Sequence, residues 1–141
     1  MGLNASFAGE LLSLIFENQD IANLGDASGV QGSSSDGVVE IALIQSNGSE
    51  ANYTGYARKT VSRLSSQWTN SGNSISNANE ITFITATGGT NTINKFRIYY
   101  GSVGQSPYSL IIGEDNLTGS VTITAGETPK FAVGALTLTF S

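Results

Sequence analysis

The chain has 141 residues, the length of one domain with a sizeable core, and 62 of them are Gly, Ser, Thr or Asn. It contains no Cys and no His, which excludes disulfides, thiolate or imidazole metal sites, and the catalytic triads or dyads that need either residue. The net charge of −5 argues against a general nucleic-acid-binding protein, because contacts to phosphate need clustered Lys and Arg. No run of about 18 apolar residues occurs, so no membrane span is expected.

The first predicted element is an amphipathic helix over residues 6–17, where apolar side chains recur three or four positions apart. Ser6 is expected to cap its N-terminus, and Gly9 lowers its stability by about 1 kcal/mol relative to Ala. Two interpretations stay open: the helix packs on its own domain, or it anchors the chain to a neighbouring subunit. The residues assigned to such a partner are Leu11, Leu12, Ile15 and Phe16.

The segment after the helix has the composition of a flexible connector. Residues 25–37 contain four Gly and four Ser and almost no apolar side chain. The sequence therefore predicts three parts: a helical arm over 1–24, a connector over 25–37 and a β domain over 38–141.

Short β-type runs follow at intervals of about ten residues. They cover residues 38–44, 56–64, 81–86, 93–100, 109–112, 120–125 and 135–140. Turn residues such as Asn47-Gly48 and Gly88-Gly89 separate them, and Trp68 is expected to pack under a turn. No helical pattern lies between the runs, which argues against a parallel doubly wound sheet. The predicted fold class is all-β: a jelly-roll-like antiparallel β-sandwich with a short N-terminal amphipathic helix arm.

Carboxylates are the remaining candidates for catalysis, since a pair of Asp or Glu side chains can hydrolyse glycosides without His. Glu114 and Asp115 are adjacent, but they lie in a predicted Gly/Asn turn where solvated side chains are expected. No catalytic residue, cofactor or metal site is therefore predicted, and the chain is not expected to be an enzyme.

Basic residues are few, and five of the six lie in the second and fourth predicted strands. Lys95 and Arg97 alternate with Phe96 and Ile98, so they should project from one face as a basic strip. Such a strip either solvates and protects the sheet or docks on an acidic surface of a partner subunit. The residues assigned to docking are Arg58, Arg63, Lys95 and Arg97.

Several short motifs carry a resemblance to a known family. They are Tyr56-Ala57-Arg58, Trp68, Ser76-Asn77, Ile81-Thr82-Phe83, Ala86-Thr87-Gly88, Gly126-x-x-Pro129-x-Phe131 and Gly134-Ala135-Leu136-Thr137, after the helical start Leu11-Leu12-x-Leu14-Ile15-Phe16. With these motifs the chain resembles a family of small tailed-bacteriophage virion proteins, which are tail-fibre or capsid-decoration proteins. The resemblance implies a non-enzymatic structural protein of the virion.

Two functions follow from this resemblance. The first is a capsid decoration or cement protein that stabilises the shell from its outer surface, and the alternative is a tail fibre or other tail-associated adhesin that binds host glycans. The length favours the first, because 141 residues leave little room for both a shaft and a receptor-binding tip. The expected partners are the major capsid protein or other virion subunits, in a homo-oligomer that is preferentially a trimer or else a dimer. No nucleic acid, membrane or cofactor is expected.

Overall fold

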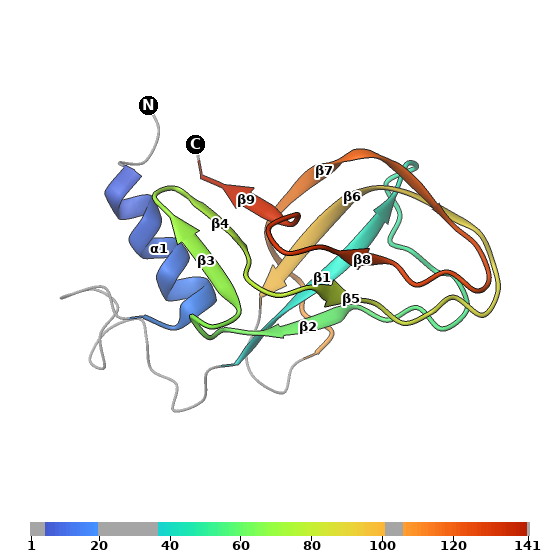
Figure 1. Cartoon of the computed structure of the whole chain (residues 1–141), viewed down its shortest axis with the longest axis horizontal. Coiled ribbons are helices and arrows are strands. Elements are labelled where there is room, and N and C mark those ends of the chain that lie inside the picture. The colour runs from blue at the N-terminus through green and yellow to red at the C-terminus, as the bar shows by residue number, and fades with distance from the viewer. Residues whose placement is uncertain (1–4, 20–36, 101–105, 141) are drawn as a thin grey trace. The chain divides into compact units, whose positions relative to one another are not determined.

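A computed structural model describes residues 5–19, 37–100 and 106–140 of the chain (Figure 1). Contacts between residues divide the chain into two units. The first unit comprises Met1–Val38, Ser62–Glu80 and Ala132–Ser141, and the second comprises Val39–Val61 and Ile81–Phe131. Each unit is therefore built from segments that are distant in the sequence. Most of the predicted connector lies outside the described residues, and the predicted domain boundaries stay a prediction.

In the first unit, one helix packs on a three-stranded antiparallel sheet with the strand order β3-β4-β9 (Figure 1). The elements are α1 (Ala5–Glu17), β3 (Trp68–Ser71), β4 (Ser74–Asn77) and β9 (Thr137–Thr139). The rings of Phe16 and Trp68 meet edge to face, with their centroids 4.5 Å apart. Ala8, Leu12 and Phe16 have no exposed surface. The apolar face of α1 is thus buried within its own unit, where it supplies much of the core.

This packing corresponds to the first interpretation of the helix, in which it lies on its own chain. Leu12 and Phe16 are core residues rather than partner-binding ones, because helical periodicity turns both of them toward β3 and β4. Leu11 and Ile15 are half-buried. Binding of a partner through these two residues stays a prediction.

The ends of α1 and the role of Gly9 differ from the sequence prediction. The helix begins at Ala5, so Ser6 lies in its first turn rather than at the cap. It ends at Glu17, and the next residue, Asn18, has a φ of 52°, the left-handed conformation common after a helix. A Cβ atom on Gly9 would lie 2.3 Å from the Gly72 carbonyl oxygen. Gly9 is therefore required by the close approach of the helix to the β3–β4 turn.

The second unit contains a four-stranded sheet with the order β2-β1-β6-β7 and a two-stranded sheet of β5 and β8. The elements are β1 (Val38–Gln45), β2 (Lys59–Ser62), β5 (Ile81–Thr82), β6 (Asn91–Tyr100), β7 (Leu110–Ile123) and β8 (Lys130–Phe131). The Phe131 ring on β8 lies 5.8 Å from the Phe96 ring on β6 and 6.2 Å from that of Phe83, between centroids. The small sheet therefore packs on one face of the large sheet through an aromatic core. The all-β antiparallel class with one short N-terminal helix is confirmed.

Strand β7 differs most from the sequence prediction. The sequence predicts two short strands around a turn at residues 113–116, whereas one strand runs from Leu110 to Ile123. Pairing with the long strand β6 overrides the turn propensity, so that Glu114 lies opposite Arg97. The register shifts between Ile93 and Lys95, and residues 117–120 have no Cα partner on β6. Val121, near the end of this strand, is 51% exposed.

The β3–β4 hairpin is absent from the sequence prediction. Its strands are short and polar, with the sequences WTNS and SISN, and they pair around Gly72, which has a φ of 66°. Trp68 lies on β3 in contact with α1, and its Nε1 donates to the Ser62 carbonyl at 2.9 Å. The helix thus supplies the apolar contact that a hairpin of this composition lacks by itself.

Candidate functional site

Charged side chains gather on one face of the four-stranded sheet in the second unit. Directly paired residues of antiparallel strands point to the same side of a sheet. Glu40 pairs with Tyr99, and Arg97 pairs with Glu114, so these side chains share a face with Lys95. The name "charged face" is used here for Glu40, Glu50, Arg58, Lys95, Arg97, Tyr99 and Glu114.

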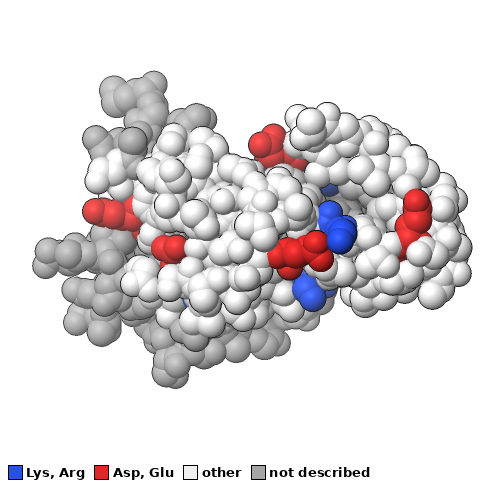
Figure 2. Space-filling model, viewed as in Figure 1, with Lys and Arg blue, Asp and Glu red and all other residues white. Residues whose placement is uncertain are grey.

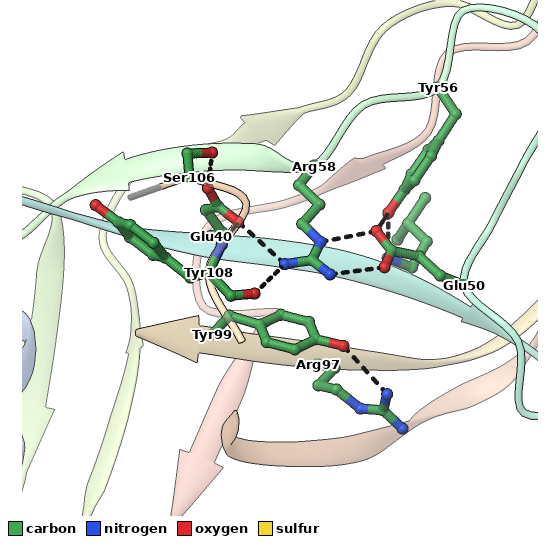
Figure 3. A network of polar contacts seen from close by, with 9 residues as sticks. Glu40, Glu50, Tyr56, Arg58, Arg97, Tyr99, Ser106 and Tyr108 are labelled. Carbon is green, nitrogen blue, oxygen red and sulfur yellow. Dashed lines mark hydrogen bonds and ion pairs between the residues drawn. The ribbon is translucent and has the colours of Figure 1, made fainter. Parts of the chain in front are cut away.

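Arg58 is the centre of the inner part of the charged face (Figure 3). Its Nε and Nη2 donate to the two carboxylate oxygens of Glu50, each at 2.9 Å. Its Nη1 donates to Glu40 Oε2 at 3.1 Å and to the Tyr108 carbonyl at 2.6 Å. The guanidinium carbon lies 3.8 Å from the centroid of the Tyr99 ring, which is a cation–π contact. Arg58 therefore holds two carboxylates and an aromatic ring in a fixed geometry.

Glu40 is the buried acid of this cluster, with 2% of its surface exposed. Desolvation raises the pKa of the Glu40 carboxyl, but hydrogen bonds from Ser106, the Tyr108 amide and Arg58 outweigh it, so the pKa is lowered. The Tyr108 amide donates to Oε2 at 2.9 Å, and the Ser106 hydroxyl contacts Oε1. Glu40 is thus a charged acceptor, fully engaged by its neighbours, and not a proton donor.

Glu50 is held from a second side by Tyr56. The Tyr56 hydroxyl donates to Glu50 Oε1 at 2.9 Å and accepts a hydrogen bond from the Leu43 amide at 3.2 Å. Burial raises the pKa of the Tyr56 hydroxyl well above its usual range, so it stays a neutral donor. The inner part of the charged face is therefore a network of mutually satisfied groups.

The outer part of the charged face consists of Lys95, Arg97 and Glu114. Arg97 Nη2 lies 2.7 Å from Glu114 Oε2, and Lys95 Nζ lies 3.5 Å from Glu114 Oε1. The Arg97 guanidinium also donates to the Tyr99 hydroxyl at 3.2 Å. The hydrogen bond from Arg97 lowers the pKa of the Glu114 carboxyl. Lys95 and Arg97 do share one face, but Glu114 neutralises one of their two charges. The predicted basic strip is a partly exposed cluster of mixed charge.

The other two basic residues assigned to docking have internal roles. Arg58 belongs to the inner network. Arg63 lies in the first unit, where it is 7% exposed and its Nη2 donates to the Leu14 carbonyl at 2.8 Å. Its Nε contacts the Ile15 carbonyl. Arg63 therefore caps the C-terminal end of α1, where a cation is favoured by the free carbonyls and the helix dipole, and its assignment to a docking strip is corrected.

Sequence reasoning missed Glu40 and Tyr99, which complete the network around Arg58. A signal for Glu40 exists, because it is a lone acid within the apolar run Val38–Ile44. A carboxylate buried in a strand needs a cation or several hydrogen-bond donors. No comparable signal identifies Tyr99, since its position opposite Glu40 depends on the register of β1 and β6.

The chemistry of the charged face is that of a rigid polar surface. Its inner carboxylates are acceptors in ion pairs with Arg58, and of the two only Glu40 is shielded from solvent, since the side chain of Glu50 is 30% exposed. In the part of the chain that the structure describes, no group of three or more potential metal-ligating residues occurs. Over the same residues, no helix has the length and apolar character needed to cross a bilayer. The arrangement fits binding or structural support better than catalysis.

A comparison with known protein families gives a match over most of the chain. The model of the family described as Podophage GP4 fiber I protein gp80 matches residues 41–139. The matched segment begins in β1 and ends in β9, and it contains every residue of the charged face except Glu40. No curated protein matches the chain.

Proposed function

The chain belongs to the podophage fibre I protein family, a family of tailed-phage virion proteins, and on that premise we propose that it is a structural subunit of a tail fibre. The observation that carries this proposal is the extent of the match, which covers the sequence from β1 to β9 rather than a single motif. A role in binding and assembly, without catalysis, agrees with the charged face. Its carboxylates are engaged in ion pairs with Arg58 and Arg97.

The proposal includes assembly with other virion subunits, among them further copies of this chain. The outer cluster of the charged face supports it, because Lys95 and Glu114 are both more than one-third exposed and carry opposite charges. A surface of mixed charge can meet a second copy with cations opposite anions. We propose a trimer in preference to a dimer. The molar mass of the purified chain, measured by light scattering after size-exclusion chromatography, tests this part.

Phage particles that lack the chain test the proposed location. A fibre subunit predicts filled capsids of unchanged thermal stability together with impaired adsorption to host cells. Capsids that lose their DNA at a lower temperature, with adsorption unchanged, would instead support the capsid decoration protein and the major capsid protein as its partner. Supplying the wild-type chain in trans during growth is the control, because it should restore the lost property.

A further inference from the structure

The turn after β1 contains the single Asn-Gly pair of the chain, Asn47-Gly48. Two backbone hydrogen bonds close the turn, from the Gly48 amide to the Gln45 carbonyl at 2.9 Å and from the Gln45 amide to the Ser49 carbonyl at 2.8 Å. Residues 46–49 are all exposed. Gly48 has a φ of 87°, and a Cβ atom at this position would meet no atom within 4 Å apart from its chain neighbours. The turn is therefore fixed by hydrogen bonds but open to solvent on its outer side.

The side chain of Asn47 lies against the backbone of this turn. Its Oδ1 accepts a hydrogen bond from the Ser49 amide at 2.9 Å, so the side-chain carbonyl reaches across the Gly48 peptide. The Gly48 nitrogen is the next backbone nitrogen in the chain, and glycine has no side chain to obstruct its approach to Asn47 Cγ. The Ser49 amide would stabilise the negative charge that such an attack places on Oδ1. A nucleophile, an electrophile and a donor for the developing charge are therefore adjacent.

We propose that Asn47 is a site of spontaneous deamidation. The Gly48 nitrogen loses its proton to a solvent base and forms a bond to Asn47 Cγ, the Cγ–Nδ2 bond breaks, and Nδ2 leaves as ammonia. Water then opens the five-membered ring at either of its carbonyl groups, which gives Asp or isoaspartate, and nothing is oxidised or reduced. Before the attack, the Gly48 nitrogen must leave the Gln45 carbonyl, so the rate depends on local opening of the turn.

Other Asn residues of the described chain are held more firmly. Asn77 and Asn91 are 1% and 4% exposed, and each side chain makes several hydrogen bonds. Asn73 is followed by a serine rather than a glycine, and its Nδ2 donates to a backbone carbonyl at 2.7 Å. We therefore expect Asn47 to react before these residues.

The modification would affect the charged face, because the turn positions Glu50. Gln45 Nε2 donates to the Glu50 carbonyl at 3.0 Å, and Glu50 forms an antiparallel bridge with Ile44. The Glu50 carboxylate in turn holds Arg58 (Figure 3). Isoaspartate adds one methylene group to the backbone after Asn47, and the longer backbone cannot keep the hydrogen bonds of the turn in their present geometry. The isoaspartyl chain should therefore have a loosened Glu50.

This inference goes beyond the proposed function and does not depend on it, so either can fail alone. The purified full chain is incubated at mildly alkaline pH and digested, and the masses of its peptides are followed over time. The peptide that contains Asn47 should gain the mass difference between an amide and an acid before any other Asn peptide does. A synthetic peptide of residues 44–51 should convert about 5- to 30-fold faster, because it lacks the hydrogen-bonded turn.

Asn47→Gln is the matched control, since its longer side chain would have to form a six-membered ring, and it should abolish the mass change. The proposal is overturned if Asn47 stays intact while the synthetic peptide converts completely, or if another Asn reacts first. Equal rates in the folded chain and the peptide would overturn the dependence on turn opening.

A second measurement tests the effect on Glu50. Both products add a negative charge, and Figure 2 shows that charged side chains cover only a small part of the visible face, so anion exchange should separate the modified chain. Asn47→Asp has the same charge with a normal backbone. The Ala51 amide, which donates to the Leu43 carbonyl at 2.8 Å, should exchange its hydrogen about tenfold faster in the modified chain than in Asn47→Asp. Equal exchange in the two would contradict a loosened Glu50.

Discussion

Arg58 joins the carboxylates of Glu40 and Glu50, and its removal leaves Glu40 charged, buried and without its cation. Arg58→Met should therefore lower the free energy of unfolding by about 3–5 kcal/mol, the usual cost of breaking a buried ion pair from one side. Urea denaturation at neutral pH measures this loss. The matched control is Lys59→Met, which removes the same charge from the exposed neighbouring residue and should cost less than about 0.5 kcal/mol.

A loss of less than about 1 kcal/mol for Arg58→Met would show that water or a local rearrangement compensates Glu40, and the inner network would not be a structural centre. The ion pair between Arg97 and Glu114 provides a second comparison for the effect of Arg58→Met. Arg97 and Glu114 are more exposed, so Arg97→Met should cost only about 0–1 kcal/mol.

The lowered pKa of Glu40 makes the stability of the chain dependent on pH. In the folded state this pKa lies below the ordinary value of 4.5, so the charged form is stabilised by folding. Its contribution is complete above about pH 4.5 and disappears as the pH falls through the lowered folded value. Between pH 6 and pH 3, the free energy of unfolding should therefore fall more for the wild type than for Glu40→Gln. Urea denaturation at several pH values measures both.

The comparison uses the pH-dependent change, so a constant destabilisation by Glu40→Gln cancels out. Parallel pH profiles for the two proteins would contradict the role of Glu40. Glu114 also has a lowered pKa, but its side chain is 37% exposed, so Glu114→Gln should alter the profile less.

At the scale of elements, the contact between α1 and the β3–β4 turn depends on Gly9. Gly9→Ala should raise helix propensity by about 1 kcal/mol, yet its Cβ would collide with the Gly72 backbone. The net result should be a destabilisation of about 1–3 kcal/mol, because a backbone atom cannot move aside as a side chain can. Thermal denaturation followed by circular dichroism measures it. Glu10→Ala, at an exposed position of the same helix, should change stability by less than about 0.5 kcal/mol, and equal stability of the two variants would refute the close contact.

Removal of residues 1–19 tests whether α1 is a detachable arm or part of the first unit. Trp68 is the single tryptophan of the chain, and it is buried against Phe16, so its fluorescence reports on this contact. The truncated chain should show red-shifted Trp68 emission and a lower melting temperature, because the apolar surface under the helix becomes exposed. The milder variant Phe16→Ala should cost about 3–5 kcal/mol. Unchanged emission and melting temperature after truncation would favour a detachable arm.

The sequence is sufficient to predict elements whose pattern is local. The spacing of apolar residues predicts α1 to within one residue at its start, and the β-type runs at 38–44 and 93–100 predict most of β1 and β6. It is not sufficient for β3, β4 and β7, because their pairing depends on distant segments. A hairpin with the sequences WTNS and SISN has no apolar period of its own, and Trp68 gains its contact only from α1.

In the charged face, too, some positions follow from the local sequence pattern and others depend on pairing with distant segments. Lys95 and Arg97 alternate along β6, so their common face follows from the sequence. The position of their partner Glu114 does not follow from the sequence, because the residues around it predict a turn where the structure has strand β7. Arg58 and Arg63 appear equivalent in the sequence, yet one holds two carboxylates and the other caps α1. These roles depend on the path of the chain after β2, which leaves the second unit at Ser62.

For the whole molecule, the resemblance to tailed-phage virion proteins is confirmed by the family match over residues 41–139. Because the family is described as a fibre protein, we propose the tail rather than the capsid surface as the location of the chain. The two units differ in formal charge: five acidic and five basic residues cancel in the second unit, which carries the charged face, whereas six acidic residues and one basic residue make the first unit acidic.

Electron cryomicroscopy of intact phage particles bound to an antibody fragment against this chain tests the central proposal most directly. The antibody fragment should be raised against the second unit, which contains most of the family match. The proposal predicts additional density on fibres at the tail and none on the capsid shell. Density distributed over the capsid surface, with an unlabelled tail, would contradict it.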